Sequence, residues 1–541
     1  MVDYIITGSG PAGCVLANRL TEDPSVKVVL LEAGGKDTHP LFAMPAGFAK
    51  MTKGIASWGW STVPQKHLND RVLWYTQAKV IGGGSSINAQ VYTRGNRGDY
   101  DAWAYEERCA GWSYADVLPY FKRAEDNQRY SNDYHGYGGP IGVSAPVNPL
   151  PINEAFIRAA QEYGIPYNPD FNGERQAGVG HYQVTVRNAR RSSASSAYLN
   201  PIRDRANLQI RTGAFVTRIL VEGGRAIGVE VVENGQTTTL RCEREVLVTS
   251  GAIGSPKLLL HSGIGPADHL RSVGVPVVHD LPGVGENLQD HLDVYAIAEC
   301  SGDYTYDNVA KLHRTVWAGI QYILFKKGPV ASTLFETGAF WYAGKPEGEP
   351  DIQFHLGLGS GIEAGVAKLQ NPGLTLNTAF LRPRSRGTVR LKSANPADHP
   401  LIDPNYWADP QDRAMSIAGL RMAREIFQQP ALKPFLLAER RPGPEIQSEA
   451  ELADYVFRTC KTDHHPAGTC KMGVDAMAVV TPDLKVRGLE GLRVCDSSIM
   501  PRVNSSNTNA PTLMIGEKAA DLVRGLSPLP AINLKPVSSA A

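Results

Sequence analysis

Residues 2–13, VDYIITGSGPAG, decide the fold at the start of the chain. An apolar run typical of a buried strand leads into Gly8, Gly10 and Gly13, and a helix-like apolar pattern follows. The first glycine permits a tight turn, the second lets a pyrophosphate approach the backbone, and the third allows a helix to pack closely on the strand. The next apolar strand ends at Glu32, whose carboxylate can accept hydrogen bonds from ribose hydroxyls. The pattern predicts a βαβ unit that binds a dinucleotide, and it leaves NAD and FAD both open.

The composition and the apolar pattern change twice along the rest of the chain. Residues 35–100 are rich in Gly, Pro and Trp and predict long ordered loops. Short β-branched runs over 205–250 predict a small antiparallel sheet that feeds one last buried strand. From about 300 to 455 the chain has strands of its own and a helix predicted at 411–429, which indicates a second domain.

Composition narrows the class of protein. At 541 residues the chain is too long for one ordinary core, and 42% hydrophobic with 20% charged residues is typical of globular proteins. A net charge of +1 gives no support for nucleic-acid binding. The seven cysteines are scattered without CxxC spacing, so we predict no metal, no disulfide framework and a cytoplasmic protein with reduced thiols.

Membrane and export signals are also weak. The first strand begins almost at once, which leaves no room for a signal peptide. No apolar run approaches the roughly 18 residues of a membrane span, so we predict no transmembrane segment. Peripheral contact with a membrane needs only a surface patch and stays open.

Five further segments carry a family resemblance. They are AKVIGGGSSIN at 78–88, GAIGSP through SGIG at 251–265, LPGVGENLQDH at 281–291, HPAGTC at 465–470, and DSSIMP through NAPT at 496–512. In this order they resemble segments of the glucose–methanol–choline (GMC) oxidoreductases, and the resemblance runs from about residue 2 to 525. Within the family the chain is most similar to the bacterial alcohol, choline and polyethylene glycol dehydrogenases.

The resemblance implies an architecture. We expect an α/β protein with a Rossmann-like FAD-binding domain of the GMC type, and a second, α+β substrate-binding domain built on an antiparallel sheet. The expected divisions are 1–155, 205–300 and 460–525 for the FAD-binding domain, 156–204 and 301–459 for the substrate-binding domain, and 526–541 for a loose C-terminal tail.

The resemblance also implies FAD as the cofactor. Asn88 would lie near the flavin ring, and the backbone of Val216 would face the adenine. Asp496 would serve the cofactor, with a helix N-cap as the alternative role. Some relatives attach the flavin through a histidine where this chain has Ile87, so we predict non-covalent FAD. The matched cofactor residues are Gly8, Gly10, Gly13, Glu32, Gly82, Gly83, Ser86, Asn88, Val216, Asp496, Pro511 and Thr512.

Alcohol oxidation by a flavin requires a base for the hydroxyl proton and an acceptor for the hydride. His465 matches the family's catalytic histidine, and Asn509 matches the His/Asn partner. The register of Asn509 depends on the APT triplet that follows it, since Asn504 and Asn507 lie in the same run. We therefore predict oxidation of a primary alcohol to an aldehyde, with the hydride passing to flavin N5.

Several alternatives remain at this point. We read Asp290 and His291 as structural or cofactor-side residues. The relatives favour a quinone or other carrier as electron acceptor, and an oxygen-using oxidase is the alternative. Hydroxynitrile lyases and light-driven decarboxylases share the family fold without this reaction. Choline would require a carboxylate and an aromatic cage, which the sequence does not locate, and the oligomeric state is left open.

Overall fold

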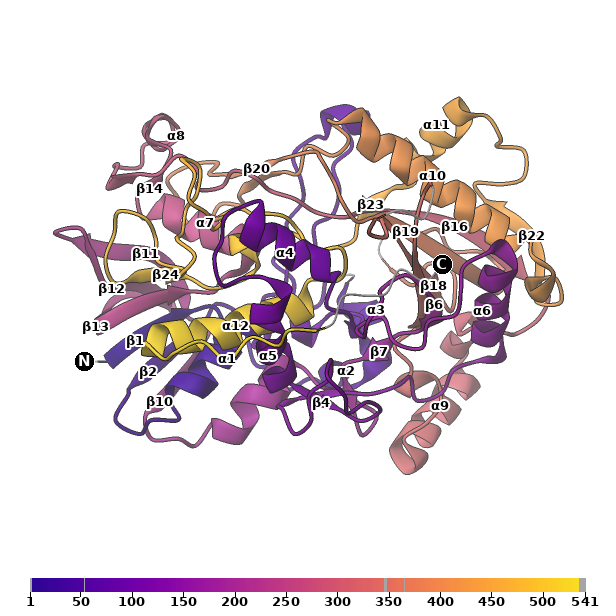
Figure 1. The fold of residues 1–541 in the computed structure, drawn as a ribbon, viewed down its shortest axis with the longest axis horizontal. Coiled ribbons are helices and arrows are strands. Elements are labelled where there is room, and N and C mark those ends of the chain that lie inside the picture. The colour runs from indigo at the N-terminus through magenta and orange to yellow at the C-terminus, as the bar shows by residue number, and fades with distance from the viewer. Residues whose placement is uncertain (1, 53, 345–347, 364, 535–541) are drawn as a thin grey trace.

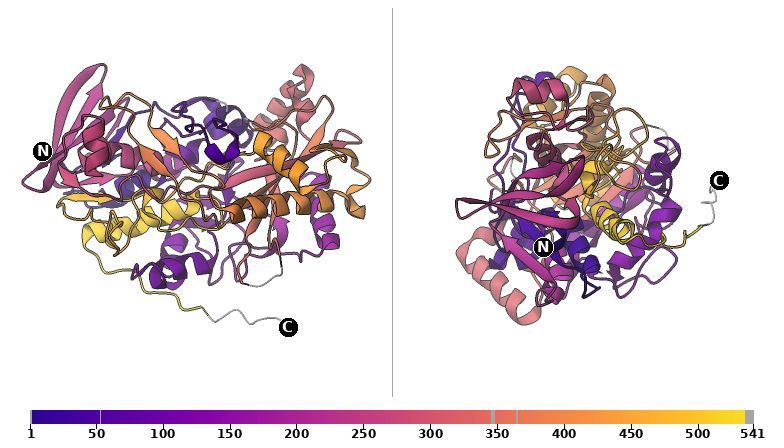
Figure 2. Two further views of the ribbon diagram at one scale, coloured as in Figure 1. Left: turned by 90° about the horizontal axis from the view of Figure 1, so that it is seen from above. Right: turned by 90° about the vertical axis from the view of Figure 1, so that its left-hand side faces the viewer.

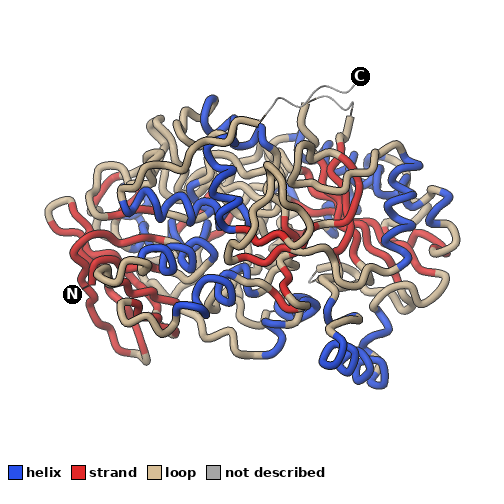
Figure 3. The backbone as a smooth tube through the Cα atoms, turned by 60° about the horizontal axis from the view of Figure 1, so that its bottom comes forward, coloured by secondary structure: helices blue, strands red, loops and turns tan. Residues whose placement is uncertain are grey.

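Two sheets, each of seven described strands, lie toward opposite ends of the molecule (Figures 1 and 3). The computed structural model describes residues 2–52, 54–344, 348–363 and 365–534. Long loops and short helices fill the space between the sheets (Figure 3). The α/β class, with a second part built on an antiparallel sheet, is confirmed.

The first sheet has the strand order β10-β2-β1-β13-β12-β11, and β24 pairs with β13. The pairings of β1 with β2 and β13 are parallel, whereas β11, β12 and β13 form an antiparallel meander. The long strand β13 therefore belongs to both parts, as the sequence predicted. The strands of this first sheet are β1 (Val2–Thr7), β2 (Val28–Glu32), β10 (Leu208–Thr212), β11 (Phe215–Glu222), β12 (Arg225–Glu233), β13 (Gln236–Val248) and β24 (Leu492–Val494).

Helices from distant parts of the chain cover the first sheet. α1 (Pro11–Leu20) packs against α12 (Asn509–Arg524), which in turn packs against α5 (Tyr114–Ala124) (Figure 1). The contact between α1 and α12 is close, because a Cβ on Gly516 would lie 2.8 Å from the Cα of Ala12. The other helices of this half are α4 (Arg97–Tyr105), α7 (Gly251–His261) and α8 (Ala267–Ser272).

The second sheet is antiparallel throughout, with the order β22-β16-β19-β18-β17-β6 and β23 paired to β16. α10 (Pro410–Phe427) packs on β16 and β19. Its bounds agree closely with those of the helix predicted at 411–429. α6 (Pro151–Tyr163) and α11 (Glu449–Thr459) also belong to this half. The strands are β6 (Gly178–His181), β16 (Leu292–Cys300), β17 (Phe335–Trp341), β18 (Ile352–Gly357), β19 (Gly373–Phe380), β22 (Leu436–Arg441) and β23 (Lys461–Thr462).

Short elements connect the two halves. Residues 35–100 form mostly loops, as predicted, and the short helices α2 (Pro40–Ala43) and α3 (Phe48–Met51) lie within them. The short 3₁₀ turn η3 (Gly83–Ser86) lies in the same stretch. Two-stranded pairs complete the structure: β3 (Val91–Tyr92) with β7 (Gln183–Val184), β4 (Glu125–Asn127) with β5 (Ile141–Val143), β8 (Val186–Arg187) with β9 (Arg190–Arg191), β14 (Ile264–Gly265) with β15 (His279–Asp280), and β20 (Thr388–Arg390) with β21 (Leu401–Asp403).

One helix stands apart from the body. α9 (Leu312–Phe325) projects from the end of the molecule that holds the second sheet (Figures 1 and 2). Within the described ranges, no helix is long and apolar enough to cross a membrane.

The C-terminal tail is docked over part of its length. The backbone N–H of Leu529 donates to the Tyr120 hydroxyl at 3.1 Å, and that of Ile532 donates to the Ala115 carbonyl at 3.0 Å. The side chains of Leu529 and Ile532 pack against the first core. The sequence suggested a loose tail because the segment lacks helix or strand periodicity, but its scattered apolar residues find a surface on α5. The end of the predicted tail, 535–541, lies outside the described residues.

Candidate active site

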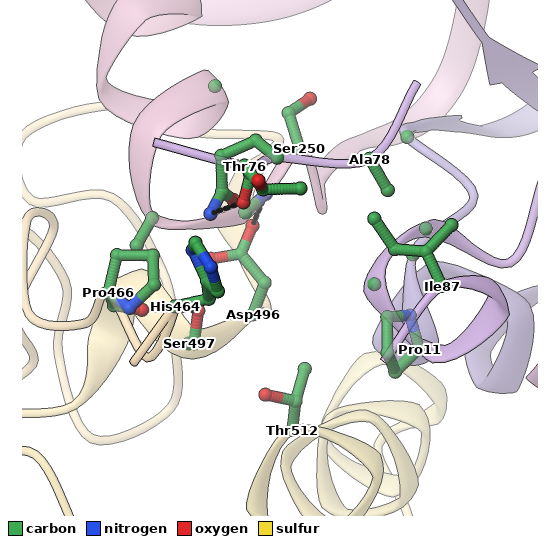
Figure 4. A pocket seen from close by; sticks show the side chains of 18 of the residues that line it. Pro11, Thr76, Ala78, Ile87, Ser250, His464, Pro466, Asp496, Ser497 and Thr512 are labelled. Atoms are coloured by element: carbon green, nitrogen blue, oxygen red, sulfur yellow. Dashed lines mark hydrogen bonds between the residues drawn. The ribbon is translucent and has the colours of Figure 1, made fainter. Parts of the chain in front are cut away.

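A single pocket of about 310 Å³ runs between the two halves of the molecule. One end is lined by the first glycine turn and Glu32, and the other by His465 and neighbouring polar side chains. Figure 4 shows Pro11, Ala78 and Ile87 on one wall, with Pro466 and Asp496 on the other. The pocket therefore joins the predicted cofactor residues to the predicted catalytic ones.

The glycine turn closes tightly around the first strand. Gly8 has φ +105°, and a Cβ there would meet the Thr249 carbonyl oxygen at 2.6 Å. A Cβ on Gly13 would meet the Gly8 carbonyl oxygen at 2.1 Å, whereas Gly10 has more room and lines the pocket. α1 begins at Pro11 without a side-chain cap, so its first backbone N–H groups remain available to an anion.

Glu32 lies at the carboxyl end of β2 and lines the pocket. One of its oxygens accepts from the Ser9 backbone N–H at 3.0 Å and the other from the Gly34 N–H at 2.7 Å. Burial raises the pKa of the Glu32 carboxyl, and these hydrogen bonds partly oppose the shift. The carboxylate is thus fixed in place with lone pairs left for a further donor.

The 78–88 segment divides into residues that face the pocket and residues that support them. Gly83 lines the pocket, and a Cβ there would lie 2.7 Å from the Cα of Gly10. Gly82 and Ser86 lie behind it: the Gly82 N–H donates to Ser9 O at 2.9 Å, and the Ser86 hydroxyl donates to Ile81 O at 2.8 Å. The segment therefore holds the glycine turn in place as well as forming a wall.

Asn88 lines the pocket, and a buried arginine fixes its side chain. Arg191 Nη1 donates to Asn88 Oδ1 and to the Asn88 carbonyl, both at 2.7 Å. Burial lowers the pKa of Arg191 to about 9. The Arg191 guanidinium was not singled out from the sequence, and it orients the amide predicted to lie beside the flavin.

The remaining predicted cofactor residues also divide into those that line the pocket and one that lies behind its wall. Val216, Asp496 and Thr512 line the pocket, whereas Pro511 is buried in the first turn of α12. One Asp496 oxygen accepts from the Gly251 N–H at 2.9 Å and from Ser255 Oγ at 2.5 Å, and the other caps a short helix at Ser498 N. Asp496 thus caps a short helix, and it also borders the pocket in which the sequence predicted a cofactor role.

The residues present fit a dinucleotide such as FAD. The three close approaches at Gly8, Gly13 and Gly83 leave backbone where side chains would otherwise stand. An uncapped helix N-terminus suits a pyrophosphate, and Glu32 suits a ribose. The pocket continues beyond these groups to the His465 end, where a ring system would lie next to the catalytic side chains.

His465 lies at the far end of the pocket and is buried. Its Nε2 is 3.0 Å from Asn507 Nδ2, and its Nδ1 is 3.0 Å from His291 Nδ1. Burial lowers the pKa of His465 well below its usual value, and the neighbouring histidines add to the effect. The imidazole is therefore neutral at physiological pH, as a base requires.

The hydrogen bonds determine which nitrogen of His465 carries the proton. His291 Nε2 is 3.2 Å from the Leu381 carbonyl oxygen, which can only accept, so His291 is protonated there. Its Nδ1 then has a lone pair and accepts the proton on His465 Nδ1. This leaves the lone pair of His465 on Nε2, the nitrogen beside Asn507.

Asn507 supports the same assignment from the other side. Its Oδ1 accepts from Gln353 Nε2 at 3.1 Å and from Thr93 Oγ1 at 3.0 Å. The Nδ2 group must therefore point at His465 and donate to Nε2. The hydrogen bonds that Asn507 accepts from Gln353 and Thr93 thus agree with an unprotonated Nε2 on His465.

His465 has a hydrogen-bond partner that the sequence analysis did not assign to it. The sequence analysis paired it with Asn509, which lines the pocket as the first residue of α12. The hydrogen bond comes instead from Asn507, two residues upstream in the loop before the helix. The reason is geometric: Asn507 lies in the loop that precedes α12, whereas Asn509 is already the first residue of the helix.

The backbone of His465 is also held firmly. Its N–H donates to Asp290 Oδ1 at 2.8 Å, and Asp290 Oδ2 accepts from the hydroxyls of Tyr75 and Thr462 at 2.9 and 2.5 Å. The preceding His464 has φ +60°, a left-handed conformation that costs a non-glycine residue on the order of 1 kcal/mol. Asp290 and its partners stabilise this turn, which agrees with a structural role for that residue.

A group of carboxylates surrounds the same end. Glu363 and Asp463 line the pocket, and Lys461 Nζ lies 3.1 Å from Glu363 and 2.6 Å from the buried Asp293. Burial, together with the nearby carboxylates, raises the pKa of Asp463 well above its usual value. Burial also raises the pKa of Asp293, to about 7. Two carboxylates, Asp293 and Glu363, thus contact one ammonium group, and Asp463 interacts with the same charge at longer range.

Asp463 approaches His465 as well. Its Oδ2 is 3.3 Å from His465 Nδ1, on the side that faces His291. His291, Asp463 and His465 offer ligand atoms within 4.8 Å of one another, a spacing that a metal ion could use. Such an ion would displace the Nδ1 proton that joins the two rings. Neither Asp463 nor the role of His291 was identified from the sequence, since only the fold brings these residues together.

Comparisons with known proteins agree with this arrangement. Family models described as GMC oxidoreductase match residues 2–293 and 383–516. An oxygen-dependent choline dehydrogenase of Brucella ovis is 42% identical over 99% of this chain and 97% of its own length. An alcohol dehydrogenase [acceptor] of Pseudomonas putida is also 42% identical, over 97% of this chain and 96% of its own. The crystal structure of pyridoxine 4-oxidase from Mesorbium loti superposes with a TM-score of 0.89 at 31% identity, and the match covers 97% of this chain and all of the other.

Proposed function

The chain belongs to the GMC oxidoreductase family, whose members act on alcohol CH–OH groups with FAD, and we propose that it oxidises a primary alcohol to an aldehyde with His465 as the base. The observation that carries this proposal is the unprotonated Nε2 of His465 at the end of the cofactor pocket, beside the Asn507 amide. When bound, FAD supplies the acceptor for the hydride that leaves the carbinol carbon.

The protein's own part is the transfer and control of one proton. The alcohol hydroxyl gives its proton to His465 Nε2. The Asn507 amide, held by Gln353 and Thr93, stabilises the developing charge on the alcohol oxygen. The imidazolium that forms keeps its Nδ1 hydrogen bond to His291, with the Asp463 carboxyl nearby. General-base catalysis of this kind contributes about 10²–10⁴-fold to a rate.

Anaerobic mixing of the FAD-loaded enzyme with a panel of primary alcohols tests this function. We expect bleaching of the flavin absorbance by at least one alcohol, and its loss in His465→Ala with bound FAD retained. If none of the alcohols bleaches the flavin, alcohol oxidation is wrong; if His465→Ala reduces at nearly the normal rate, His465 is not the base.

The charges at the catalytic end support a cationic alcohol as substrate. Glu363 and Asp463 line the pocket there, and Phe48 and Phe335 line the same pocket with ring centroids 5.8 Å apart. A carboxylate and aromatic rings in one pocket suit a quaternary or protonated amine. We expect choline to reduce the flavin more efficiently than 3,3-dimethyl-1-butanol, its uncharged analogue, and Glu363→Gln to reduce that difference. Equal efficiency for the two alcohols would reject the cation site.

For the electron acceptor we propose a quinone or another carrier rather than oxygen. The reduced enzyme from the anaerobic experiment, divided between oxygen and a soluble quinone, distinguishes a dehydrogenase from an oxidase. Faster reoxidation by oxygen would favour the oxidase. Seven buried, unbridged cysteines, all within the described ranges, support a reducing, cytoplasmic location.

Two further proposals concern the cofactor. Ile87 lines the pocket where a covalent link would need a nucleophilic nitrogen, so denaturation should release free FAD. We also propose that the chain divides as the sequence suggested, with 1–155, 205–300 and 460–525 binding FAD. The first sheet, built from β1, β2, β10–β13 and β24, supports most of that division. Two strands within the proposed FAD-binding ranges, β16 and β23, belong to the second sheet instead, so the boundaries near 300 and 460 fall on its side.

A further inference from the structure

The exposed surface of α9 is unusually apolar. Of the twenty large apolar side chains that are exposed in the described part of the chain, seven lie on this helix of 14 residues. The exposed fractions reach 80% at Leu312, 68% at Ile323 and 67% at Leu324. The seven side chains are Leu312, Val316, Trp317, Ile320, Ile323, Leu324 and Phe325.

These side chains form one face that points away from the protein. At about 100° of rotation per residue, all but Phe325 fall within an arc of about 140°. The buried residues of α9, Ala318 and Tyr322, lie on the other side of the helix. Tyr322 packs with Ala331 and Ala189 in a small separate cluster. The helix is thus fastened by one edge and presents its apolar face to solvent. Figures 1 and 2 show that the helix itself projects from the body.

The charges around this face are positive. Residues 308–335 contain no Asp or Glu, whereas exposed lysines flank the helix at Lys311, Lys326 and Lys327. The nearby Arg314 is paired with Asp303. An apolar helix face bordered by lysines is the pattern of helices that lie in the interface of an anionic membrane.

From this arrangement we propose that α9 docks the enzyme on a lipid surface that contains anionic phospholipids. The helix is about 21 Å long, too short for a hydrocarbon core of about 30 Å, so it lies in the plane of the membrane. Trp317 and its apolar neighbours insert below the headgroups, and the lysines contact the phosphates.

The same charges argue against a second copy of the chain as the occupant. Two copies related by a twofold axis through α9 would bring Lys311, Lys326 and Lys327 of both to one interface. No carboxylate between 308 and 335 is available to neutralise them. An anionic lipid surface neutralises the same groups directly.

Sedimentation of the FAD-loaded enzyme with vesicles tests the proposal. We expect binding to phosphatidylcholine vesicles that contain about 30% phosphatidylglycerol, and weaker binding without the anionic lipid or in roughly 0.5 M salt. Replacing Trp317, Ile323 and Leu324 with Gln should lower partitioning about tenfold or more. Val278→Gln, Leu437→Gln and Tyr137→Gln together form the matched control, since these exposed apolar residues lie elsewhere on the surface.

A second pair of variants tests the lysines. Lys326→Glu with Lys327→Glu should weaken binding to the anionic vesicles, whereas Lys392→Glu with Lys433→Glu should not. Alcohol oxidation in solution should be normal in all four variants, which verifies their folding. The proposal is overturned if the wild-type enzyme does not sediment, or if the α9 variant sediments equally well. A lipid-free dimer that the α9 variant abolishes would also overturn it.

Discussion

His291 Nδ1 lies 3.0 Å from His465 Nδ1, and the two rings are nearly perpendicular, with an interplanar angle of 84°. Because His291 Nε2 is committed to the Leu381 carbonyl, His291 can only accept at this contact. A residue outside the lining of the pocket thus selects which nitrogen of His465 is unprotonated.

Replacing His291 should therefore impair catalysis through His465. We expect His291→Phe to retain FAD and to slow anaerobic flavin reduction by about 10- to 100-fold, because His465 Nδ1–H loses its acceptor. His291→Asn should restore much of the rate, since its amide oxygen can accept the same proton. Equal losses in both variants would show that only ring packing matters.

Replacing Asn507 and replacing Asn509 with alanine should affect the rate of flavin reduction differently. Asn507→Ala removes the donor to His465 Nε2 and should lower the reduction rate about 10- to 1000-fold, in the range measured for a lost transition-state donor. Asn509→Ala, at the start of α12, should have a much smaller effect on the rate. Stopped-flow reduction of both variants compares them directly. The reverse order would restore Asn509 as the catalytic partner.

The pH dependence follows from the lowered pKa of His465. A base must be unprotonated, and burial favours the neutral imidazole, so activity should be lost only at pH values below the ordinary histidine pKa of 6.5. The rate of flavin reduction by an uncharged alcohol should be nearly constant between about pH 7 and 8. A titration midpoint near 7 that disappears in His465→Gln would contradict the lowered pKa.

The glycine approaches can be tested at Gly83. An alanine there would place a Cβ 2.7 Å from the Cα of Gly10 at a φ of +54°, so we expect a loss of bound FAD. Gly35→Ala is the matched control, because its Cβ meets nothing within 4 Å. The ratio of flavin to protein absorbance measures both variants. A full FAD content in Gly83→Ala would mean that the turn can relax.

Glu336 links stability to pH. Burial raises the pKa of this carboxyl from 4.5 to about 7, although Ser332 and Asn153 donate to it. The proton is held more tightly in the folded state, so stability from this group is full below pH 4.5 and is lost as the pH rises to about 7. The cost is about 3 kcal/mol at higher pH.

Glu336→Gln should then raise Tm at pH 8 and change it little at pH 4.5. Its amide can still accept from Asn153 and can donate to Ser332. Thermal unfolding at both pH values measures the difference. A variant that is destabilised equally at both would show that Glu336 is ionised in the folded protein.

Apolar spacing and glycine positions in the sequence predicted turns and helices that form within a few residues. The turn at Gly8 and the helix at Pro410–Phe427 were found because apolar spacing and glycine positions act over a few residues. The contact between His291 and His465 spans 174 residues, and no local pattern encodes it. The choice between Asn507 and Asn509 depended on where α12 begins, and helix starts are set by packing as well as by sequence.

For α9 the sequence does not reveal which face of the helix is exposed. This helix was not singled out from the sequence, and apolar periodicity alone does not distinguish a buried face from one that is exposed. Only the surrounding structure shows that Ala318 and Tyr322, rather than the seven exposed apolar side chains, face the protein.

The order of the strands has a consequence for synthesis. β1 is made first, but its neighbour β13 follows more than 200 residues later, and β24 and α12 come from the last fifth of the chain. The apolar surface of α1 therefore waits uncovered on the nascent chain until α12 has left the ribosome. A premature stop before residue 509 would leave that surface open, and such a fragment is a natural target for chaperones and proteases.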